Sequence, residues 1–413
     1  MDIIVKCVCS IVQLQYTVQI RFTEGSGKMR DVYLDNAATS FPKAPGVGEA
    51  IKNFVEKSAT NINRSGYNVG FTAEELVFET REMICDLVNF TKTENIIFTV
   101  NATTGLNILI KGVLKPGDHC LVSSVEHNAV MRPLNQISQI GVECTRIPCD
   151  SKGKLDVATI PKLIKSNTKA IIMTHASNVT GTILPLKEVG QICAKSDLYF
   201  IVDGSQTLGS LPINFTDAGI HALAFTGHKS LLGPQGIGGF VVSPILADKI
   251  EPLICGGTGS LSEREEQPMI LPDKFEAGTI NLPGIAGLHQ ALKFIMQTGI
   301  DAIRLHELEL TQALLGGLKA LPNIRIIGSS EMKERTSLIS IDCLKHDNAD
   351  VAYTLQKEYG IRTRCGLHCA PAAHKTVDTF PQGTIRFSPG YFNTKKEMDY
   401  TISSLQKILT EPL

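Results

Sequence analysis

The sequence predicts an α/β protein: a large domain whose mostly parallel sheet is covered by helices, followed by a smaller α+β domain. Short apolar runs alternate with helical stretches over residues 29–285, and this alternation is typical of a parallel sheet with helices on both faces. The pattern changes in residues 286–413, where a long helical segment, Gly284–Leu321, precedes a mixture of strands and helices. A chain of 413 residues is also long enough for two hydrophobic cores.

The strands of the first domain are predicted from runs that are short, apolar and followed by Gly, Asn, Asp or Ser, as buried parallel strands are. These runs are Asn95–Val100, His119–Ser123, Lys169–Thr174, Tyr199–Val202, Ala222–Phe225 and Gly238–Val242. The helical stretches between them are Ala73–Val88, Gly105–Lys111, Pro161–Lys165 and Leu186–Ala194. In the second domain we expect strands at Arg325–Ile327, Ser337–Ile341 and Thr384–Phe387, helices at Asp350–Glu358 and Lys395–Leu409, and a loop at Arg364–His374.

The charge and the cysteine content of the chain limit the kinds of partner and compartment that we expect for the protein. The formal net charge of -1 gives no electrostatic reason for binding nucleic acid or an anionic membrane. Eleven cysteines are scattered without a regular framework, which is typical of a reduced, cytoplasmic protein. Residues 3–22 are apolar, but polar side chains interrupt them too often for a membrane span. We expect Met29 to be the physiological start and residues 1–28 to be an extension that is not native.

Lys229 is the first residue with a chemical role to consider. It follows the strand Ala222–Phe225 and precedes a glycine-rich run, Gly233–Gly239. The carboxyl edge of a parallel sheet is where α/β folds bind ligands. A lysine that is partly desolvated there has a lowered pKa and can form a Schiff base. The alternative is an ordinary solvated surface lysine.

Asp203 ends another apolar strand, so it shares the edge of the sheet with Lys229. A carboxylate there can pair with the ring nitrogen of pyridoxal 5'-phosphate (PLP) and keep it protonated. The alternative is an aspartate that caps a following helix.

Two further segments favour a binding site at this edge. Asn101–Gly105 joins a strand to a helical stretch, and hydroxyls with free amides at a helix N-terminus bind anions. His127 follows a strand and could stack on a planar ring or relay protons. The alternatives are simple N-capping for the first segment and a structural role for the histidine.

The segment Arg364–Pro371 combines an arginine, a histidine and two cysteines. A nearby guanidinium or imidazolium favours the thiolate form of a cysteine. A zinc loop is one alternative, although a second ligand pair at the usual spacing is missing. A labile disulfide between Cys365 and Cys369 is another.

Nine segments in order resemble the class V aminotransferase fold group, specifically its cysteine desulfurase and selenocysteine lyase family. They are Tyr33–Thr39, Asn101–Asn107, Glu126–Asn128, His175–Thr182, Val202–Gln206, Thr226–Ser230, Phe275–Asn281, Arg364–Pro371 and the stretch around Arg386. The compact cysteine segment is similar to that of the SufS-like branch. The resemblance implies a PLP-dependent transferase of fold type I and a homodimer.

The resemblance also implies roles for single residues in binding the cofactor. Lys229 would hold PLP as a Schiff base, Asp203 would pair with the pyridine nitrogen, and Gln206 would bond the phenolic oxygen. His127 would stack on the ring and help to move protons. The remaining residues implied in cofactor binding surround the phosphate and are Thr103, Thr104, Thr226, His228 and, from the other subunit, Thr279.

For the reaction, the resemblance implies L-cysteine as substrate, L-alanine as product, and sulfur transfer to Cys369 and then to an acceptor protein. Asn178 and Arg386 would lie at the substrate carboxylate, and Arg364 beside Cys369. Departures from the family pattern are Tyr67 in place of a histidine, Gly105 in place of a glutamate, and Cys365 in place of Thr or Ala. Selenocysteine lyase, transamination or kynureninase-type cleavage, and an inactive scaffold stay open as alternatives.

Overall fold

The computed structural model of the protein describes residues 31–58 and 73–410. The expectations for residues 1–28, for Met29 as start and for Tyr67 lie outside the described residues. In the described part of the chain, no helix is both long enough and apolar enough to cross a membrane.

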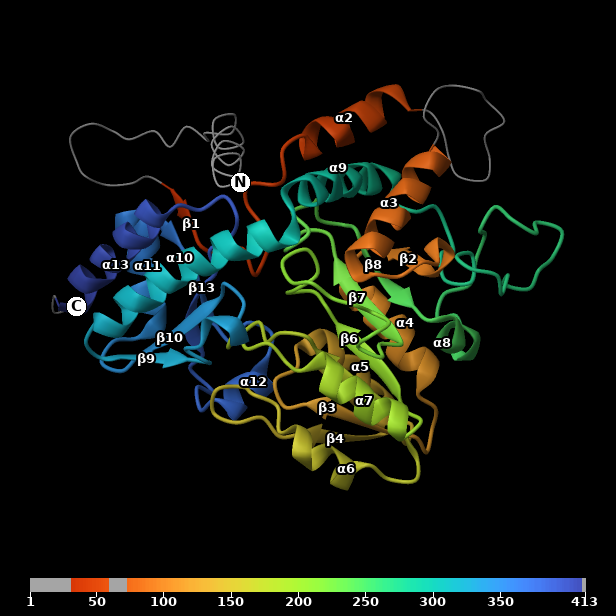
Figure 1. Cartoon of the computed structure of the whole chain (residues 1–413), viewed down its shortest axis with the longest axis horizontal. Helices are drawn as coiled ribbons and strands as arrows, with labels where there is room; N and C mark the ends of the chain where they lie inside the picture. The colour runs from red at the N-terminus through yellow and green to blue at the C-terminus, as the bar shows by residue number, and fades with distance from the viewer. Residues whose placement is uncertain (1–30, 59–72, 411–413) are drawn as a thin grey trace, which may run out of the picture.

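A sheet of seven strands forms the centre of the larger part of the molecule (Figure 1). In spatial order its strands are β2 (Ile96–Thr99), β8 (Gly238–Val242), β7 (Ala222–Thr226), β6 (Tyr199–Asp203), β5 (Thr168–Thr174), β3 (His119–Ser123) and β4 (Glu143–Ile147). Strands β4, β3, β5, β6 and β7 are parallel, whereas β8 runs antiparallel to both β7 and β2. The mostly parallel α/β fold is therefore confirmed.

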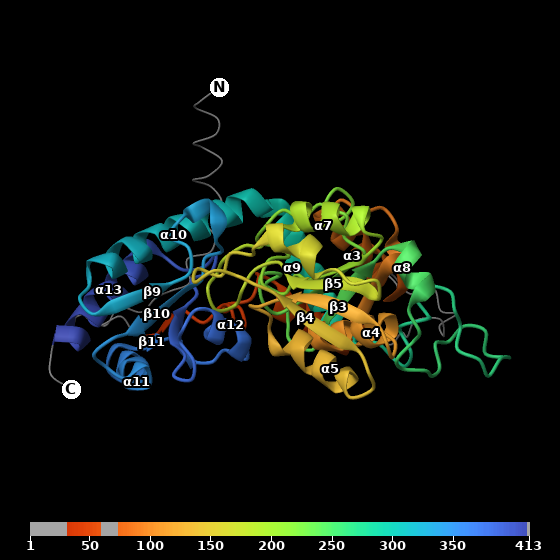
Figure 2. The same ribbon diagram turned by 90° about the horizontal axis from the view of Figure 1, so that it is seen from below.

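Helices cover both faces of this sheet. Successive residues of a strand point to opposite faces, so a strand that is apolar throughout needs cover on both. Within β5, Ile171 and Met173 belong to one core cluster, and Ala170 and Ile172 belong to the other. The helices of the larger part are α2 (Val47–Lys57), α3 (Ala73–Val88), α4 (Ala102–Val113), α5 (Asn128–Ser138), α6 (Ile160–Leu163), α7 (Leu186–Lys195), α8 (Pro244–Lys249) and α9 (Leu282–Thr298). Helices α3, α7 and α9 lie on one face, and α4 and α5 lie on the other (Figure 2).

A third core cluster belongs to the C-terminal part. Its antiparallel sheet has the order β12 (Arg364–Gly366), β13 (Thr384–Phe387), β10 (Ile339–Cys343) and β9 (Ile324–Ile327). Its helices are α10 (Ile300–Ala320), α11 (Asn348–Tyr359), α12 (Pro371–Thr376) and α13 (Lys395–Thr410). Strand β1 (Val32–Tyr33) pairs in parallel with β11 (Ile361–Arg362), so this early segment packs with the C-terminal part.

The long helical segment expected at Gly284–Leu321 is two helices. Gly299 separates α9 from α10 and has φ 85° and ψ 133°, a conformation that disfavours side chains and ends the helix. The segment Arg364–His374, expected as a loop, contains strand β12 and the start of α12. The division of the chain at residues 285 and 286 stays a prediction.

Candidate active site

The segments that follow β2, β3, β5, β6 and β7 meet around one pocket, with about 490 Å³ of space including its open mouth. Nine of the residues expected from the sequence line it: Thr103, His127, Asn178, Asp203, Gln206, Thr226 and His228, together with Lys229 and the helix-capping Asn101. This convergence follows from the parallel topology, because the carboxyl ends of parallel strands share one edge of the sheet.

Lys229 lies in this pocket, three residues after the end of β7. Burial of its amine lowers its pKa to about 8, the neighbouring Asp203 carboxylate opposes that shift, and the guanidinium groups of Arg386 and Arg364 add to it. The alternative of a solvated surface lysine does not fit this environment.

Asp203 is the last residue of β6, and its side chain is buried. Its Oδ1 accepts hydrogen bonds from the Ser205 amide at 3.0 Å and the Ser205 hydroxyl at 2.5 Å. These bonds orient the carboxylate through one oxygen. The carboxylate can therefore cap the local turn and also pair with a cation in the pocket.

His127 is both a structural cap and a pocket residue. It is the N-cap of α5, and its Nδ1 accepts a hydrogen bond from the Ala129 amide at 3.0 Å. Burial, together with the positive charge of Lys229, lowers the pKa of its imidazole to about 4. The ring is therefore neutral near pH 7, and because Nδ1 accepts, Nε2 carries the proton.

One end of the pocket is suited to an anion. Among residues 31–58 and 73–410, neither Thr226 Oγ1 nor His228 Nδ1 has a hydrogen-bond partner, although both atoms are buried, and both residues line the pocket. Helix α4 begins beside them, and its N-cap Asn101 accepts a hydrogen bond from the Thr104 amide at 2.9 Å. Two unpartnered polar side chains and a helix N-terminus fit the phosphate of PLP.

The glycine-rich run after Lys229 has a packing role at this end. A Cβ atom at Gly238 would lie 2.7 Å from the Phe225 carbonyl oxygen and 3.0 Å from the Ala102 amide nitrogen. Glycine therefore lets β8 pack tightly against β7 and against the first residue of α4. The glycine-rich run therefore allows close packing within the sheet and at the end of the pocket that suits an anion. The expected close approach of its backbone to a cofactor ring stays a prediction.

Three expected cofactor residues have other surroundings in the single chain. Gln206 lines the pocket, but its Nε2 donates to the Ala37 carbonyl at 3.0 Å. The Thr104 hydroxyl contacts Asn101 Oδ1 at 3.2 Å and lies in the helix cap. Thr279 is exposed and does not line the pocket of its own chain.

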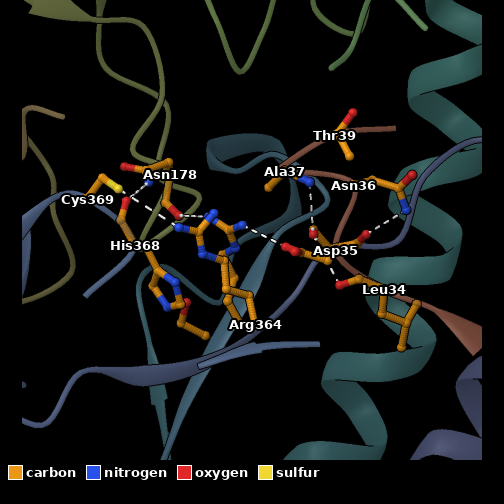
Figure 3. A network of polar contacts seen from close by, with 12 residues as sticks. Leu34, Asp35, Asn36, Ala37, Thr39, Asn178, Arg364, His368 and Cys369 are labelled. Atoms are coloured by element: carbon orange, nitrogen blue, oxygen red, sulfur yellow. Dashed lines mark hydrogen bonds and ion pairs between the residues drawn. The ribbon is translucent and has the colours of Figure 1, made fainter. Parts of the chain in front are cut away.

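Cys369 is exposed and lies against the start of α5. Its carbonyl oxygen accepts a hydrogen bond from the Asn128 amide at 2.8 Å. Its Sγ lies 3.8 Å from Nη2 of Arg364, as the dashed line between these two side chains shows (Figure 3). Cys369 and the preceding His368 both have positive φ angles, 57° and 48°, so this turn holds two non-glycine residues in a sparsely populated conformation.

Arg364 supplies the positive charge beside this sulfur. Burial lowers the pKa of His368 to about 2, so its imidazole is neutral; its Nε2 pairs with Thr384 Oγ1 at 3.1 Å. Cys365 packs against the C-terminal core, and burial raises its pKa. Both cysteines are free thiols. In the described parts of the chain, no three His, Cys, Asp or Glu side chains are grouped to hold a metal ion.

Arg386 lies in β13 and is only 1% exposed. Its Nη2 pairs with Asp35 Oδ1 at 2.8 Å, and its Nη1 donates to the Asn178 carbonyl at 3.1 Å. The Asn178 side chain donates in turn to the His368 carbonyl at 2.7 Å. The sequence reasoning used Asp35 only as part of a motif and missed its contact with Arg386, which joins residues 351 positions apart.

The fold is that of the PLP-dependent transferases of fold type I. The class-V aminotransferase model matches residues 32–401. The chain belongs to this family and, within it, to the cysteine desulfurases.

Relatives of the chain are found in bacteria and in archaea. A probable cysteine desulfurase of Halalkalibacterium halodurans is 32% identical over 91% of this chain and 92% of that protein. One of Methanothermobacter thermautotrophicus is 31% identical over 92% of this chain and 95% of that protein. Two solved structures are similar over 92% of this chain and 94% of theirs: the apo cysteine desulfurase of Thermococcus onnurineus NA1, with a TM-score of 0.84 and 29% identity, and the cysteine desulfurase CsdA of Escherichia coli, with 0.82 and 28%.

Proposed function

We propose that the protein is a PLP-dependent cysteine desulfurase, which converts L-cysteine to L-alanine and receives the sulfur on Cys369 as a persulfide. The observation that carries this proposal is the position of an exposed thiol, beside a guanidinium, next to a pocket that contains Lys229 and Asp203. Lys229 and Asp203 serve many reactions of this family equally well, whereas the thiol favours sulfur transfer.

The residues that would hold PLP are those that line the pocket. Lys229 would bind it covalently, Asp203 would face the ring nitrogen, and neutral His127 would lie on the ring. Thr226 and His228 would bind the phosphate with Thr103 at the start of α4, and Thr104 would support that helix end. Gln206 would turn its amide toward the phenolic oxygen. When bound, PLP supplies a cationic ring that stabilises negative charge at the substrate Cα.

Lys229 would also act as the base. Burial lowers its pKa to about 8, so a useful fraction of the amine is unprotonated near neutral pH. With its amine free and unprotonated, Lys229 would remove the Cα proton of the substrate. Neutral His127, with its proton on Nε2, would assist proton transfer at the substrate sulfur and amine.

Cys369 would then attack the sulfur of the substrate as a thiolate. The bond from Cβ to sulfur breaks, and a sulfur–sulfur bond forms on Cys369. The Cβ carbon gains a proton, so that one L-cysteine and one enzyme thiol give one L-alanine and one enzyme persulfide. Arg364, whose Nη2 lies 3.8 Å from Sγ, would place its positive charge beside the attacking sulfur.

Arg386 and Asn178 would bind the substrate carboxylate. A guanidinium suits this task because its planar donors match the two carboxylate oxygens. The Arg386 charge lowers the pKa of Lys229, and Cys369 raises the pKa of Arg386, which supports a reaction centre shared by the three groups.

The proposal extends to the assembly and its setting. A homodimer would bring Thr279 of one subunit to the phosphate in the other, which accounts for a residue that is exposed in the single chain. The persulfide on Cys369 would pass to an acceptor protein. The part from 29 to 285 would act as the cofactor domain and the part from 286 to 413 would carry the sulfur-accepting segment, in a cytoplasmic enzyme.

The experiment that tests the function replaces the thiol. In Cys369→Ala, we expect sulfide release from L-cysteine to be lost while the yellow absorbance of the bound cofactor is kept. Cys365→Ala is the matched control, because this thiol lies in the neighbouring strand and faces the C-terminal core. We expect the Cys365→Ala enzyme to keep its activity with L-cysteine. Full activity of Cys369→Ala with L-cysteine would refute sulfur transfer through this residue. Loss of activity with L-cysteine but not with L-selenocysteine would favour a selenocysteine lyase.

A further inference from the structure

Asp35 lies beside Arg386 because of how the chain returns to its own beginning. After β1, the backbone of Asp35 forms a parallel bridge with Ser388. The Ser388 amide donates to the Leu34 carbonyl at 2.7 Å, and the Asn36 amide donates to the Ser388 carbonyl at 3.2 Å. Arg386 lies two residues before Ser388. The early segment is therefore fixed alongside the end of β13, and the Asp35 carboxylate meets the guanidinium at 2.8 Å.

The electrostatics of Arg386 require such a partner. The side chain is 1% exposed, and in the described part of the chain Asp35 is the one carboxylate that forms an ion pair with it. Burial lowers the pKa of Arg386, Asp35 opposes this shift, and the positive charge of Arg364 adds to it. A buried guanidinium that faces a second cation is costly unless a carboxylate balances it.

The contacts also fix the plane of the guanidinium. Nη2 is bound to Asp35 and Nη1 to the Asn178 carbonyl, whereas Nε is buried and has no partner in the part of the chain that the structure describes. Because the group is planar and rigid, two contacts at its end determine where its remaining N–H groups point. Asp35 lies on one side of this network, and Asn178, Arg364 and Cys369 lie on the other (Figure 3). The guanidinium of Arg386 is therefore held by Asp35 on one side and by the Asn178 carbonyl on the side of the thiol.

We propose that Asp35 is a positioning residue for substrate recognition: it orients Arg386 so that the free N–H groups of the guanidinium receive the α-carboxylate of the substrate. This inference rests on the proposed contact between Arg386 and that carboxylate. It predicts a role confined to ligands that carry a carboxylate, because Asp35 itself touches neither the thiol nor the amine end of the site.

The test compares L-cysteine with cysteamine, which has the same amine and thiol but no carboxylate. Binding of each to the PLP-loaded enzyme is followed by the change in cofactor absorbance. For Asp35→Ala we expect affinity for L-cysteine to fall by about ten-fold, the loss typical of a charge-assisted hydrogen bond, with cysteamine unaffected. Asp35→Asn keeps an acceptor oxygen but no charge, so its affinity for L-cysteine should fall by about three-fold.

Ser388→Ala is the matched control. The Ser388 hydroxyl accepts from the Ala37 amide at 3.0 Å and donates to the Leu34 carbonyl at 3.2 Å, so the change loosens the same segment without touching the ion pair. Both ligands should bind this variant as they bind the native enzyme. Thermal unfolding and bound cofactor confirm that each variant is folded.

The outcomes separate this inference from the proposed function. An equal loss of affinity for L-cysteine and cysteamine in Asp35→Ala would show a merely structural role and overturn the inference. If Asp35→Ala does not fold, Asp35→Asn decides, and unchanged affinity for L-cysteine in that variant overturns the inference. Arg386→Ala tests the underlying contact: if L-cysteine binds this variant normally, the proposed carboxylate site itself is wrong. A loss in Arg386→Ala without a loss at Asp35 contradicts the positioning role alone.

Discussion

Burial shifts the titratable groups around the pocket toward their neutral forms. It lowers the pKa of Lys229 to about 8 and that of His127 to about 4, and it raises that of Glu126 to about 8. Glu126 is held between strands, where its carboxylate accepts from the Ser123 hydroxyl and from the Thr174 amide. Near pH 7, His127 and Glu126 are therefore mainly neutral, whereas most of the Lys229 amine is still protonated and lies beside Asp203.

The first prediction concerns the reactivity of Lys229 in the apoprotein. Because its pKa is about 8, roughly one tenth of its amine is unprotonated at pH 7, far more than for a solvated lysine. Acetic anhydride should therefore label Lys229 at a rate that rises with pH and reaches half its maximum near pH 8, as measured by peptide mass spectrometry. Asp203 raises the pKa of Lys229, so Asp203→Asn should move this midpoint to lower pH.

Asp217→Asn is the control for this experiment, since Asp217 is an exposed carboxylate that bonds Asn214. Its midpoint should equal that of the native chain. A midpoint near that of exposed lysines, or one that does not respond to Asp203→Asn, would contradict the assignment of a buried amine coupled to this carboxylate.

At the scale of single residues, the sequence predicted that strand ends meet at one edge of the sheet, and the residues at these ends line one pocket. Lys229, Asp203 and His127 each follow an apolar run, and parallel topology alone is enough to bring such ends together. Asp35 could not be found in this way, because its partner Arg386 is 351 positions away and the bridge between their strands has no local signal. The neutrality of His368 was also hidden, since it depends on burial by the C-terminal core.

At the scale of elements, prediction succeeded where the apolar pattern of an element is clear. Strands β3 and β8 and helix α3 have the expected bounds, because continuous apolar runs and a clear helical period mark them. Strand β4 was missed: it lies at the edge of the sheet, and Ile147 is the one buried residue of the five in Glu143–Ile147. An edge strand with exposed polar side chains lacks the apolar pattern on which the prediction relied.

Helix α4 links stability to cofactor binding. Its N-cap Asn101 accepts a hydrogen bond from the Thr104 amide at 2.9 Å, which orders the turn that the proposed phosphate site uses. Asn101→Ala should lower the free energy of unfolding by about 1 kcal/mol, measured by urea denaturation of the apoprotein. It should also weaken the binding of PLP but not of pyridoxal, which lacks the phosphate.

The N-cap of α8 provides the comparison. Ser243 accepts a hydrogen bond from the Leu246 amide at 3.3 Å and does not line the pocket. Ser243→Ala should lower stability without changing the affinity for PLP. Equal affinities of native protein and Asn101→Ala for PLP would mean that this helix end does not serve the phosphate.

At the scale of the whole molecule, a single chain explains only part of the proposed site. The pocket gathers residues from five strand ends, yet Thr279 is exposed and outside it. The same region carries exposed apolar side chains at Leu253, Ile254, Met269 and Ile270. A second copy of the chain that covers this region would bury those side chains and place Thr279 beside the neighbouring phosphate site, as closed two-fold symmetry requires of both subunits at once.

Subunit mixing tests this arrangement. Lys229→Ala removes the amine of its own site, and Thr279→Asp places a negative charge at the phosphate of the neighbouring site, so each homodimer should be inactive. Random mixing makes about half of the dimers mixed, and each mixed dimer contains one site with native Lys229 and native Thr279, so about a quarter of the native activity should return. Mixing Lys229→Ala with Lys229→Ala/Thr279→Asp is the control and should restore nothing. If Thr279 served its own chain, each mixed dimer would combine two defective sites, and desulfuration would stay absent after mixing.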